Sequence, residues 1–193
     1  MRHQTRDSPS TAGAGRVELA PAQAERFHAL YRDHFDFVFR NLRRLGVPSA
    51  AIDDALQDVY IVALRRIDDF QEGTHPKAWL FAIALRVAGN YRRAQRRRRE
   101  RLALDSAPPA TAQQDPFEHA AQGEARRLLH DFLGVLDDNR RAVFIMSELE
   151  QLTVPEIART LSANLNTVYS WLRSARIEFT QRSTKLQGGA RRG

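Results

Sequence analysis

Residues 152 to 176 constrain this chain more than any other stretch. They read LTVPEIARTLSANLNTVYSWLRSAR, a pattern typical of two short helices joined by a tight turn. Thr153 and Glu156 fit a capping box, in which the side chains satisfy free backbone N–H groups at a helix start. Pro155 suits the first turn, where no N–H donor is needed. Asn164 is a suitable cap for the second helix.

The second helix of this pair is predicted to have one apolar and one polar face. The apolar face has helical spacing and comprises Leu165, Val168, Leu172, Ala175 and Phe179. The opposite face carries Asn166, Thr167, Ser170 and Arg173. Such a pair is typical of a DNA-binding helix-turn-helix, whose second helix lies in the major groove. A plain helical hairpin has the same local pattern, so the rest of the chain must decide between them.

Composition narrows the class of partner. The chain has 193 residues and 42% hydrophobic content, which suffices for one ordinary domain or two small ones. Its net charge of +7 and isoelectric point near 10.6 favour a polyanionic partner.

There is no cysteine, and the six histidines show no ligand spacing, so no metal or cofactor is expected. No apolar run approaches the length of a membrane span, and no signal peptide is apparent. We therefore expect no membrane insertion and a cytoplasmic location.

The first part of the chain is predicted to be helical after a disordered tail at residues 1–20. Helical spacing of apolar residues begins at Pro21, and a second helix is expected from about Ser49 to Ile67. The first half of that second helix holds an acidic cluster, comprising Asp53, Asp54, Gln57 and Asp58. Acidic groups near a helix N-terminus complement the helix dipole, which is one interpretation. An acidic docking face is the other.

A third helix, starting at Pro76, is predicted to be strongly basic. Residues 76–101 hold nine basic residues and one acidic residue, a net charge of +8. Seven of these arginines lie within ten residues, at 92–101, and such crowding favours a nucleic acid partner over a merely solvated face.

An acidic linker is predicted at residues 102–118, which contain three acids, no base and three prolines. It divides an all-α chain into two small helical domains, at 21–101 and 119–184, expected to have separate cores. The second domain contains the helix-turn-helix. Residues 185–193 are predicted to be a flexible basic tail, and no strand pattern appears.

These motifs, in this order, resemble the extracytoplasmic-function RNA polymerase sigma factors of bacteria over roughly residues 24–184. AIDDALQDVYIVALRRIDDF resembles the family's core-polymerase-binding helix. HPKAWLFAIALRVAGNYRRAQRRR resembles the segment that opens the promoter's minus-ten element. Residues 152–176 resemble the helix pair that reads the minus-thirty-five element. Ser162 and Asn166 depart from the family, which often has glycine there, and Tyr169 and Trp171 stand where it often has Lys or Arg.

The resemblance implies a sigma factor without enzymatic activity that binds core RNA polymerase, selects promoters and helps open the DNA. The implied polymerase-binding residues are Asp54, Gln57 and Asp58. The implied minus-ten and melting residues are Trp79, Asn90, Tyr91, Arg92, Arg93 and Arg96. The positions outside the apolar face of the last helix, together with its N-terminal end, predict the minus-thirty-five residues as Asn166, Thr167, Tyr169, Ser170, Arg173 and Arg176. An anti-sigma protein is a common partner in this family, although no segment here encodes that contact.

Some alternatives stay open. Trp79 can pack in a core instead of capturing a base, and Tyr169 lies at an edge where it can pack or touch a thymine methyl group. A one-component helix-turn-helix regulator would act without polymerase, but residues 24–101 show no ligand or phosphoryl-acceptor pattern. A nucleic-acid enzyme such as a recombinase would need a catalytic carboxylate, nucleophile or phosphate-loop set, and none is apparent.

Overall fold

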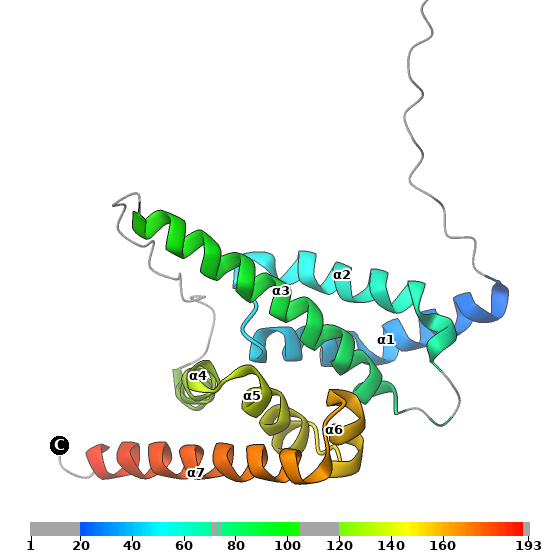
Figure 1. Ribbon diagram of the computed structural model, residues 1–193. Coiled ribbons are helices and arrows are strands. Elements are labelled where there is room, and N and C mark those ends of the chain that lie inside the picture. Colours follow the sequence, from blue (N-terminus) through cyan, green and yellow to red (C-terminus); the bar gives the residue numbers. More distant parts are fainter. Residues whose placement is uncertain (1–19, 71–72, 74, 105–119, 191–193) are drawn as a thin grey trace, which may run out of the picture.

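Seven α-helices account for most of the residues that the structure describes, and no strand occurs among them (Figure 1). The computed structural model describes residues 20–70, 73, 75–104 and 120–190. The predicted all-α, two-domain class is confirmed. The predicted disordered tail, apart from residue 20, and the linker from residue 105 onward lie outside the described residues.

The first domain consists of α1 (Pro21–Arg44), α2 (Ile52–Arg65) and α3 (Pro76–Leu104), which pack against one another. α1 starts at a proline, as expected, and is followed by Gly46, whose φ of 83° is a left-handed conformation that glycine adopts without strain. Apolar residues at helical spacing along α2 and the turn after it are all buried; they are Ile52, Leu56, Val59, Ala63 and Ile67. α2 itself is shorter than predicted, since 3-10 turns flank it at Ser49–Ala51 and Ile67–Asp69.

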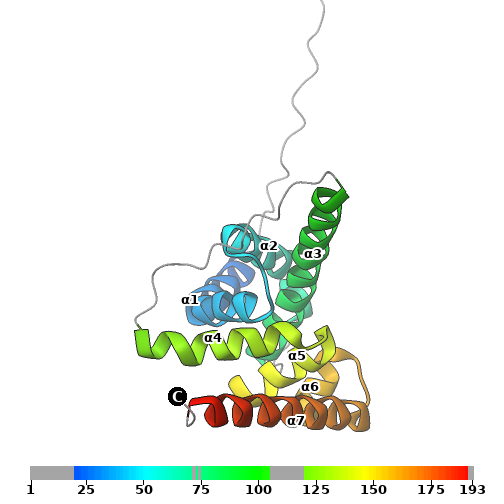
Figure 2. The same ribbon diagram turned by 90° about the vertical axis from the view of Figure 1, so that its left-hand side faces the viewer.

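α3 begins at Pro76 as predicted and continues to Leu104, three residues into the stretch predicted to be linker. Its N-terminal half is apolar and packs on α1 and α2, where Leu80, Phe81 and Ala84 are fully buried. Its C-terminal half projects beyond the other helices (Figures 1 and 2). The arginines at residues 96–99 and 101 are therefore exposed to solvent.

The second domain consists of α4 (Ala120–Val135), α5 (Asp138–Phe144), a π-helical turn (Ile145–Leu149), α6 (Val154–Leu161) and α7 (Leu165–Ala190). Phe132 of α4 and Phe144 of α5 have ring centroids 4.8 Å apart, and Phe179 of α7 lies 5.2 Å and 5.6 Å from them. α7 continues to Ala190, six residues into the stretch predicted to be a flexible basic tail.

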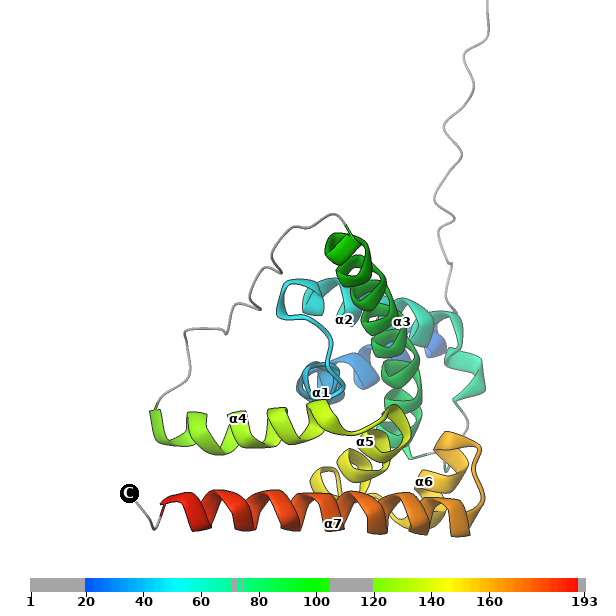
Figure 3. The same ribbon diagram turned by 60° about the vertical axis from the view of Figure 1, so that its left-hand side comes forward.

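The two domains pack against each other. The buried apolar residues of both form one connected cluster, whereas separate cores were expected. α5 and α6 lie beneath α1 and α3, and α7 lies on the far side of the second domain from the first (Figures 1 and 3). The sequence could not show this contact, because it joins residues far apart along the chain.

Candidate nucleic-acid interface

The start of α6 is fixed by the predicted capping box. The backbone N–H of Thr153 donates to Glu156 Oε2 at 2.8 Å, and the Thr153 hydroxyl donates to the same oxygen at 2.7 Å. These bonds lower the pKa of Glu156 below its ordinary value, because they stabilise the carboxylate. The capping box predicted at this position is therefore present.

The turn between α6 and α7 has the geometry that a helix-turn-helix requires. Ser162 ends α6 with φ 51° and ψ 40°, a left-handed conformation often taken by glycine. Asn164 then caps α7, since its Oδ1 accepts a hydrogen bond from the Thr167 N–H at 2.8 Å. A serine thus stands at the left-handed position, which explains how the turn forms without the glycine that the family often has.

The inward face of α7 is only partly the one predicted. Val168, Leu172 and Ala175 are buried, as expected. Leu165, assigned to the same apolar face, is instead 47% exposed, so that prediction is wrong. It is the first residue of α7, and side chains on a helix lean toward the N-terminus, past the end of the packed surface. Phe179 is 42% exposed, although its ring contacts two other phenylalanines.

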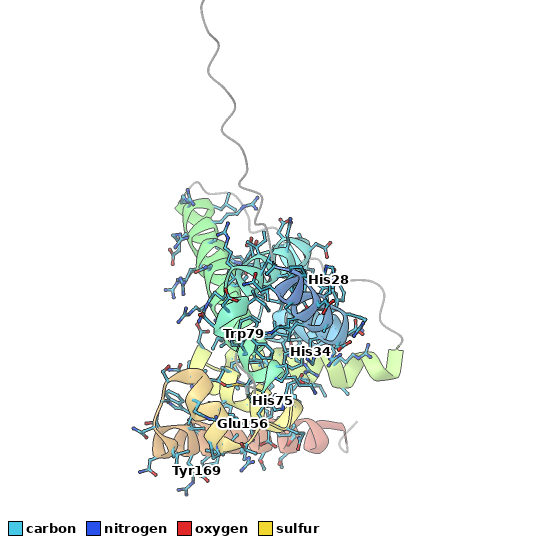
Figure 4. All side chains as sticks on the ribbon, turned by 90° about the vertical axis from the view of Figure 1, so that its right-hand side faces the viewer. His28, His34, His75, Trp79, Glu156 and Tyr169 are labelled. Carbon is cyan, nitrogen blue, oxygen red and sulfur yellow. The ribbon has the colours of Figure 1, made fainter. Side chains whose placement is uncertain are left out.

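The first turns of α7 present the predicted DNA-reading residues to solvent. Asn166 and Ser170 are exposed, Thr167 is half-buried, and Tyr169 is 57% exposed. Figure 4 shows Tyr169 on the side of α7 away from the first domain. An open concavity of about 760 Å³ lies here, lined by Asn164, Leu165, Asn166, Thr167, Ser170 and Trp171. The structure therefore groups these residues on one accessible surface.

The two predicted arginines of α7 differ in their surroundings. Arg173 is exposed and makes no ion pair with any residue of the described ranges. Arg176 donates from Nε and Nη2 to Glu148 Oε1, at 3.0 Å and 2.7 Å. Both arginines remain accessible to a phosphate group, but Arg176 must share its charge with a carboxylate.

Trp79 does not lie with the other residues predicted to act on the minus-ten element. It is half-buried, its ring lies 5.2 Å from that of Phe70, and it packs against the core. Eleven residues separate it from Asn90, which is roughly 16 Å along a helix axis. Figure 4 shows Trp79 within the body of the first domain. The contacts support its packing role.

The remaining residues of that set are together on α3, and most of them have partners. The Tyr91 hydroxyl donates to Asp58 Oδ2 at 2.9 Å; burial and this hydrogen bond raise the pKa of Tyr91 to about 12. Arg93 donates to Asn90 Oδ1 at 2.5 Å. Arg96 forms an ion pair with Glu100 at 2.9 Å.

Arg92 is bound across the domain boundary. Its Nη2 lies 2.7 Å from Asp138 Oδ2 at the start of α5, and its Nη1 donates to the Leu45 carbonyl. Only 17% of its side chain is exposed. A residue expected to face DNA is therefore held by the second domain in this arrangement.

The residues predicted to bind polymerase lie on one exposed face of α2. Asp54, Gln57 and Asp58 are all exposed. Ile61, one turn further along, is 38% exposed on the same face and was not singled out from the sequence. α2 lies on the side of the first domain away from α5–α7 (Figure 2). This acidic face is therefore clear of the interdomain contact.

A buried polar interface between the domains could not be recognised from local patterns. Glu150 Oε1 accepts from Arg44 at 2.5 Å and from Asn41 Nδ2 at 3.1 Å, and its side chain is only 4% exposed. Arg141 is 8% exposed and donates to the carbonyls of Leu133, Leu136 and Leu45, at 2.7, 2.9 and 3.3 Å. Burial lowers its pKa. In the sequence, the only indication of this buried interface was the presence of charged residues within otherwise apolar stretches.

Neither a metal cluster nor a membrane span is found in the described part of the chain. No group of three or more His, Asp or Glu residues there could hold a metal ion. None of the described helices is long and apolar enough to cross a membrane.

The fold and these surfaces define an all-helical DNA-binding protein with two domains. Comparison with known families agrees and is more specific. Residues 30–98 match Sigma-70 region 2, and residues 126–178 match Sigma-70 region 4. Together the two regions cover more than half of the chain.

Several known proteins are similar over most of their length. The RNA polymerase sigma factor YlaC of Bacillus subtilis is 26% identical over 157 residues, 81% of this chain and 91% of that protein. The sigma factor CnrH of Cupriavidus metallidurans is 26% identical over 172 residues, with 85% and 90% covered. The extracytoplasmic-function sigma-E factor of Escherichia coli K12 is 28% identical over 138 residues, with 67% and 72% covered.

Two solved structures share the fold. One is CnrH in complex with the cytosolic domain of CnrY, with a TM-score of 0.60 and 24% identity, covering 82% of this chain and 92% of that one. The other is the sigma factor RpoE of Bartonella quintana in complex with the anti-sigma factor NepR, with a TM-score of 0.56 and 20% identity, covering 81% and 98%. The chain belongs to the extracytoplasmic-function RNA polymerase sigma factors.

Proposed function

We propose that this protein binds core RNA polymerase, directs it to specific promoters and helps to open the DNA for transcription initiation. The observation that carries the proposal is the separation of its surfaces. An acidic face on α2 and a DNA-reading face on α7 lie on opposite sides of the molecule, so both can be engaged at once (Figure 1).

Polymerase docking is assigned to Asp54, Gln57 and Asp58. They form an exposed, acidic and polar face in a chain whose net charge is +7. Ile61 extends this face with an apolar group, which is the usual composition of a protein contact with a polar rim. The family places its polymerase-binding helix at this position.

Contact with the minus-ten element is assigned to the C-terminal half of α3, namely to Asn90, Tyr91, Arg92, Arg93 and Arg96. Arginines neutralise phosphates, and an aromatic ring with an amide nearby suits an unpaired base. We assign Trp79 a supporting role in holding α3 against the first domain, because its ring packs on Phe70.

Contact with the minus-thirty-five element is assigned to the first turns of α7. Asn166, Thr167 and Ser170 supply hydrogen-bonding groups near the helix N-terminus, the end that enters the major groove. Arg173 is assigned to a base or its adjacent phosphate, and Arg176 to a phosphate.

The proposal gives the chain no catalytic step and no cofactor, and it places the protein in the cytoplasm with the polymerase. An anti-sigma protein is a further proposed partner. The similar structure of RpoE contains a bound anti-sigma factor, NepR, and that of CnrH contains the bound cytosolic domain of CnrY.

The test combines binding and transcription. The purified protein is mixed with core polymerase, co-elution is measured by gel filtration, and initiation is mapped on a library of genomic fragments. We expect a stable complex and initiation at a defined set of promoters. Asp54→Lys should weaken the complex, whereas Glu25→Lys, the same charge change at an exposed site on α1, should not.

Tight, sequence-specific DNA binding by the isolated protein, without a polymerase complex, would contradict the proposal. That result would favour a one-component regulator instead.

A further inference from the structure

We infer that the first two turns of α7 recognise thymine methyl groups through Leu165 and Tyr169. The inference rests on the proposed function and adds the chemistry that the helix reads. Leu165 is 47% exposed and Tyr169 is 57% exposed. They lie four residues apart, so they share one face of the helix with about 5–6 Å between their Cβ atoms.

Neither residue serves the packing of the described chain. Both are absent from the core and from the half-buried residues that pack against it, which do include the neighbouring Trp171. Single exposed apolar residues are common on protein surfaces and need no explanation. Here two of them form a pair within the same turns as the polar residues Asn166 and Ser170.

The charge around this pair favours DNA over a protein as the occupant. Residues 157–177, which form most of α6 and the first half of α7, include three arginines and no acidic residue. Further along α7 the surroundings change, because Ile177 and Phe179 lie beside Glu178 and the Arg176–Glu148 ion pair. Of the three arginines, Arg176 is paired with Glu148, whereas Arg173 has no ion-pair partner among the described residues. Along α7, the first turns therefore combine exposed apolar groups with the unpaired charge of Arg173.

Thymine is the base that such a pair can recognise. It alone among the four bases presents a methyl group in the major groove, and apolar side chains contact that group. The spacing of 5–6 Å between the two side chains corresponds to one or two base steps of about 3.4 Å. We therefore expect two thymines, one or two steps apart, in the upstream element of the promoters that this protein selects.

Replacing thymine by uracil tests this directly, because uracil lacks only the methyl group. The holoenzyme is assembled from core polymerase and this protein, and a promoter is taken from the initiation map. Each thymine of the upstream element is replaced singly, and binding is measured. Losing contact with one methyl group should weaken binding by about fourfold at each of two positions.

Variants then assign each position to a side chain. Leu165→Ala should abolish the uracil effect at one position, and Tyr169→Ala at the other. Tyr169→Phe should keep the effect, since the ring and not the hydroxyl makes the contact. Ile177→Ala is the matched control: that residue is 48% exposed on the same helix but lies three turns further along. It should leave both effects unchanged.

Three outcomes would overturn the inference. A holoenzyme that initiates normally but is insensitive to uracil would refute it and leave the proposed function intact. Leu165→Ala that weakens the polymerase complex without altering the uracil effect would assign the pair to a protein contact. A protein that directs polymerase to no promoter would overturn the proposed function as well.

Discussion

The C-terminal half of α3 and the first turns of α7 are both expected to contact DNA, but their arginines differ in the partners that they have within the protein. On α3, Arg92, Arg93 and Arg96 each bond to another residue of the protein. On α7, Arg173 has no ion-pair partner among the described residues, and Tyr169 is mostly exposed. One surface is partly occupied by the protein itself, while the other is open.

This difference predicts which arginines must leave a partner within the protein before they can bind DNA. A phosphate can replace Glu100 at the exposed Arg96 with little movement, since exposed ion pairs are weak. Arg92 can meet DNA only after Asp138, which belongs to the second domain, has moved away. We therefore expect free protein to bind promoter DNA poorly, and polymerase to hold the domains at a spacing that makes the second contact intramolecular.

The largest expected effect is the loss of stability on replacing Arg141, a buried arginine that donates hydrogen bonds to carbonyls of both domains. Arg141→Met keeps most of the side-chain volume but leaves the carbonyls of Leu133 and Leu136 without their charged donor. The Leu45 carbonyl loses one of its two arginine donors and keeps Arg92. We expect the free energy of unfolding to fall by about 3 kcal/mol. Denaturant titration measures this. Arg140→Met, whose ion pair with Asp137 is more exposed, should cost less than about 1 kcal/mol; equal losses would show that burial does not matter here.

The open surface is tested by Arg173→Ala. Because Arg173 has no ion-pair partner to lose among the described residues, stability should not change. Promoter binding by holoenzyme should weaken by roughly 1–3 kcal/mol, with relaxed preference at one base. Arg176→Ala should instead weaken binding to all promoters alike. It should also reduce, by about one, the slope of the logarithm of the binding constant against the logarithm of the salt concentration. Binding across single-base variants at several salt concentrations separates the two. Unchanged specificity and slope for Arg173→Ala would remove this helix from the interface.

Freeing the occupied surface should have a smaller effect. Asp138→Asn removes the ion pair that holds Arg92, at a stability cost of at most about 1 kcal/mol because Asp138 is 61% exposed. Arg92 then keeps only its bond to the Leu45 carbonyl, and its freed Nη2 should add one phosphate contact. The slope of the logarithm of the nonspecific DNA-binding constant against the logarithm of the salt concentration should therefore increase in magnitude by about 0.9 for the free protein. Asp131→Asn makes the same charge change on exposed α4 and should leave the slope unaltered. Identical slopes for both variants would mean that the Asp138 ion pair does not control whether Arg92 reaches DNA.

The smallest expected effect lies at the start of α6. In Glu156→Gln the capping bonds can persist, but the negative charge at the helix N-terminus is lost, which should cost about 0.5 kcal/mol at neutral pH. The folded pKa of Glu156 is lowered, so its stabilisation is present above the ordinary value of 4.5 and is lost as the pH falls through the lowered pKa. The free energies of unfolding of the two proteins, measured by urea titration at several pH values, should therefore become equal in acid. A constant difference would show that the charge has no part in the cap.

The sequence by itself determined the local structure of the DNA-reading region. The capping box at Thr153, the Asn164 cap and the buried Val168 and Leu172 all appear as predicted. Each depends on residues within four positions of one another, and short-range geometry fixes such contacts wherever the helix packs. The start of α3 at Pro76 is predictable for the same reason.

Only the tertiary structure decided which of those surfaces are free. Helical spacing identified the apolar face of α7 but did not show how far along α7 the neighbouring helices cover it. Leu165, at the start of α7, is therefore exposed although it was predicted to face inward. The partner of Arg92 is Asp138, and that of Arg44 is Glu150, more than 40 and 100 residues away along the chain. Ion pairs of that kind leave no periodic trace in a sequence, because they depend on how whole domains meet and not on the helices that carry them.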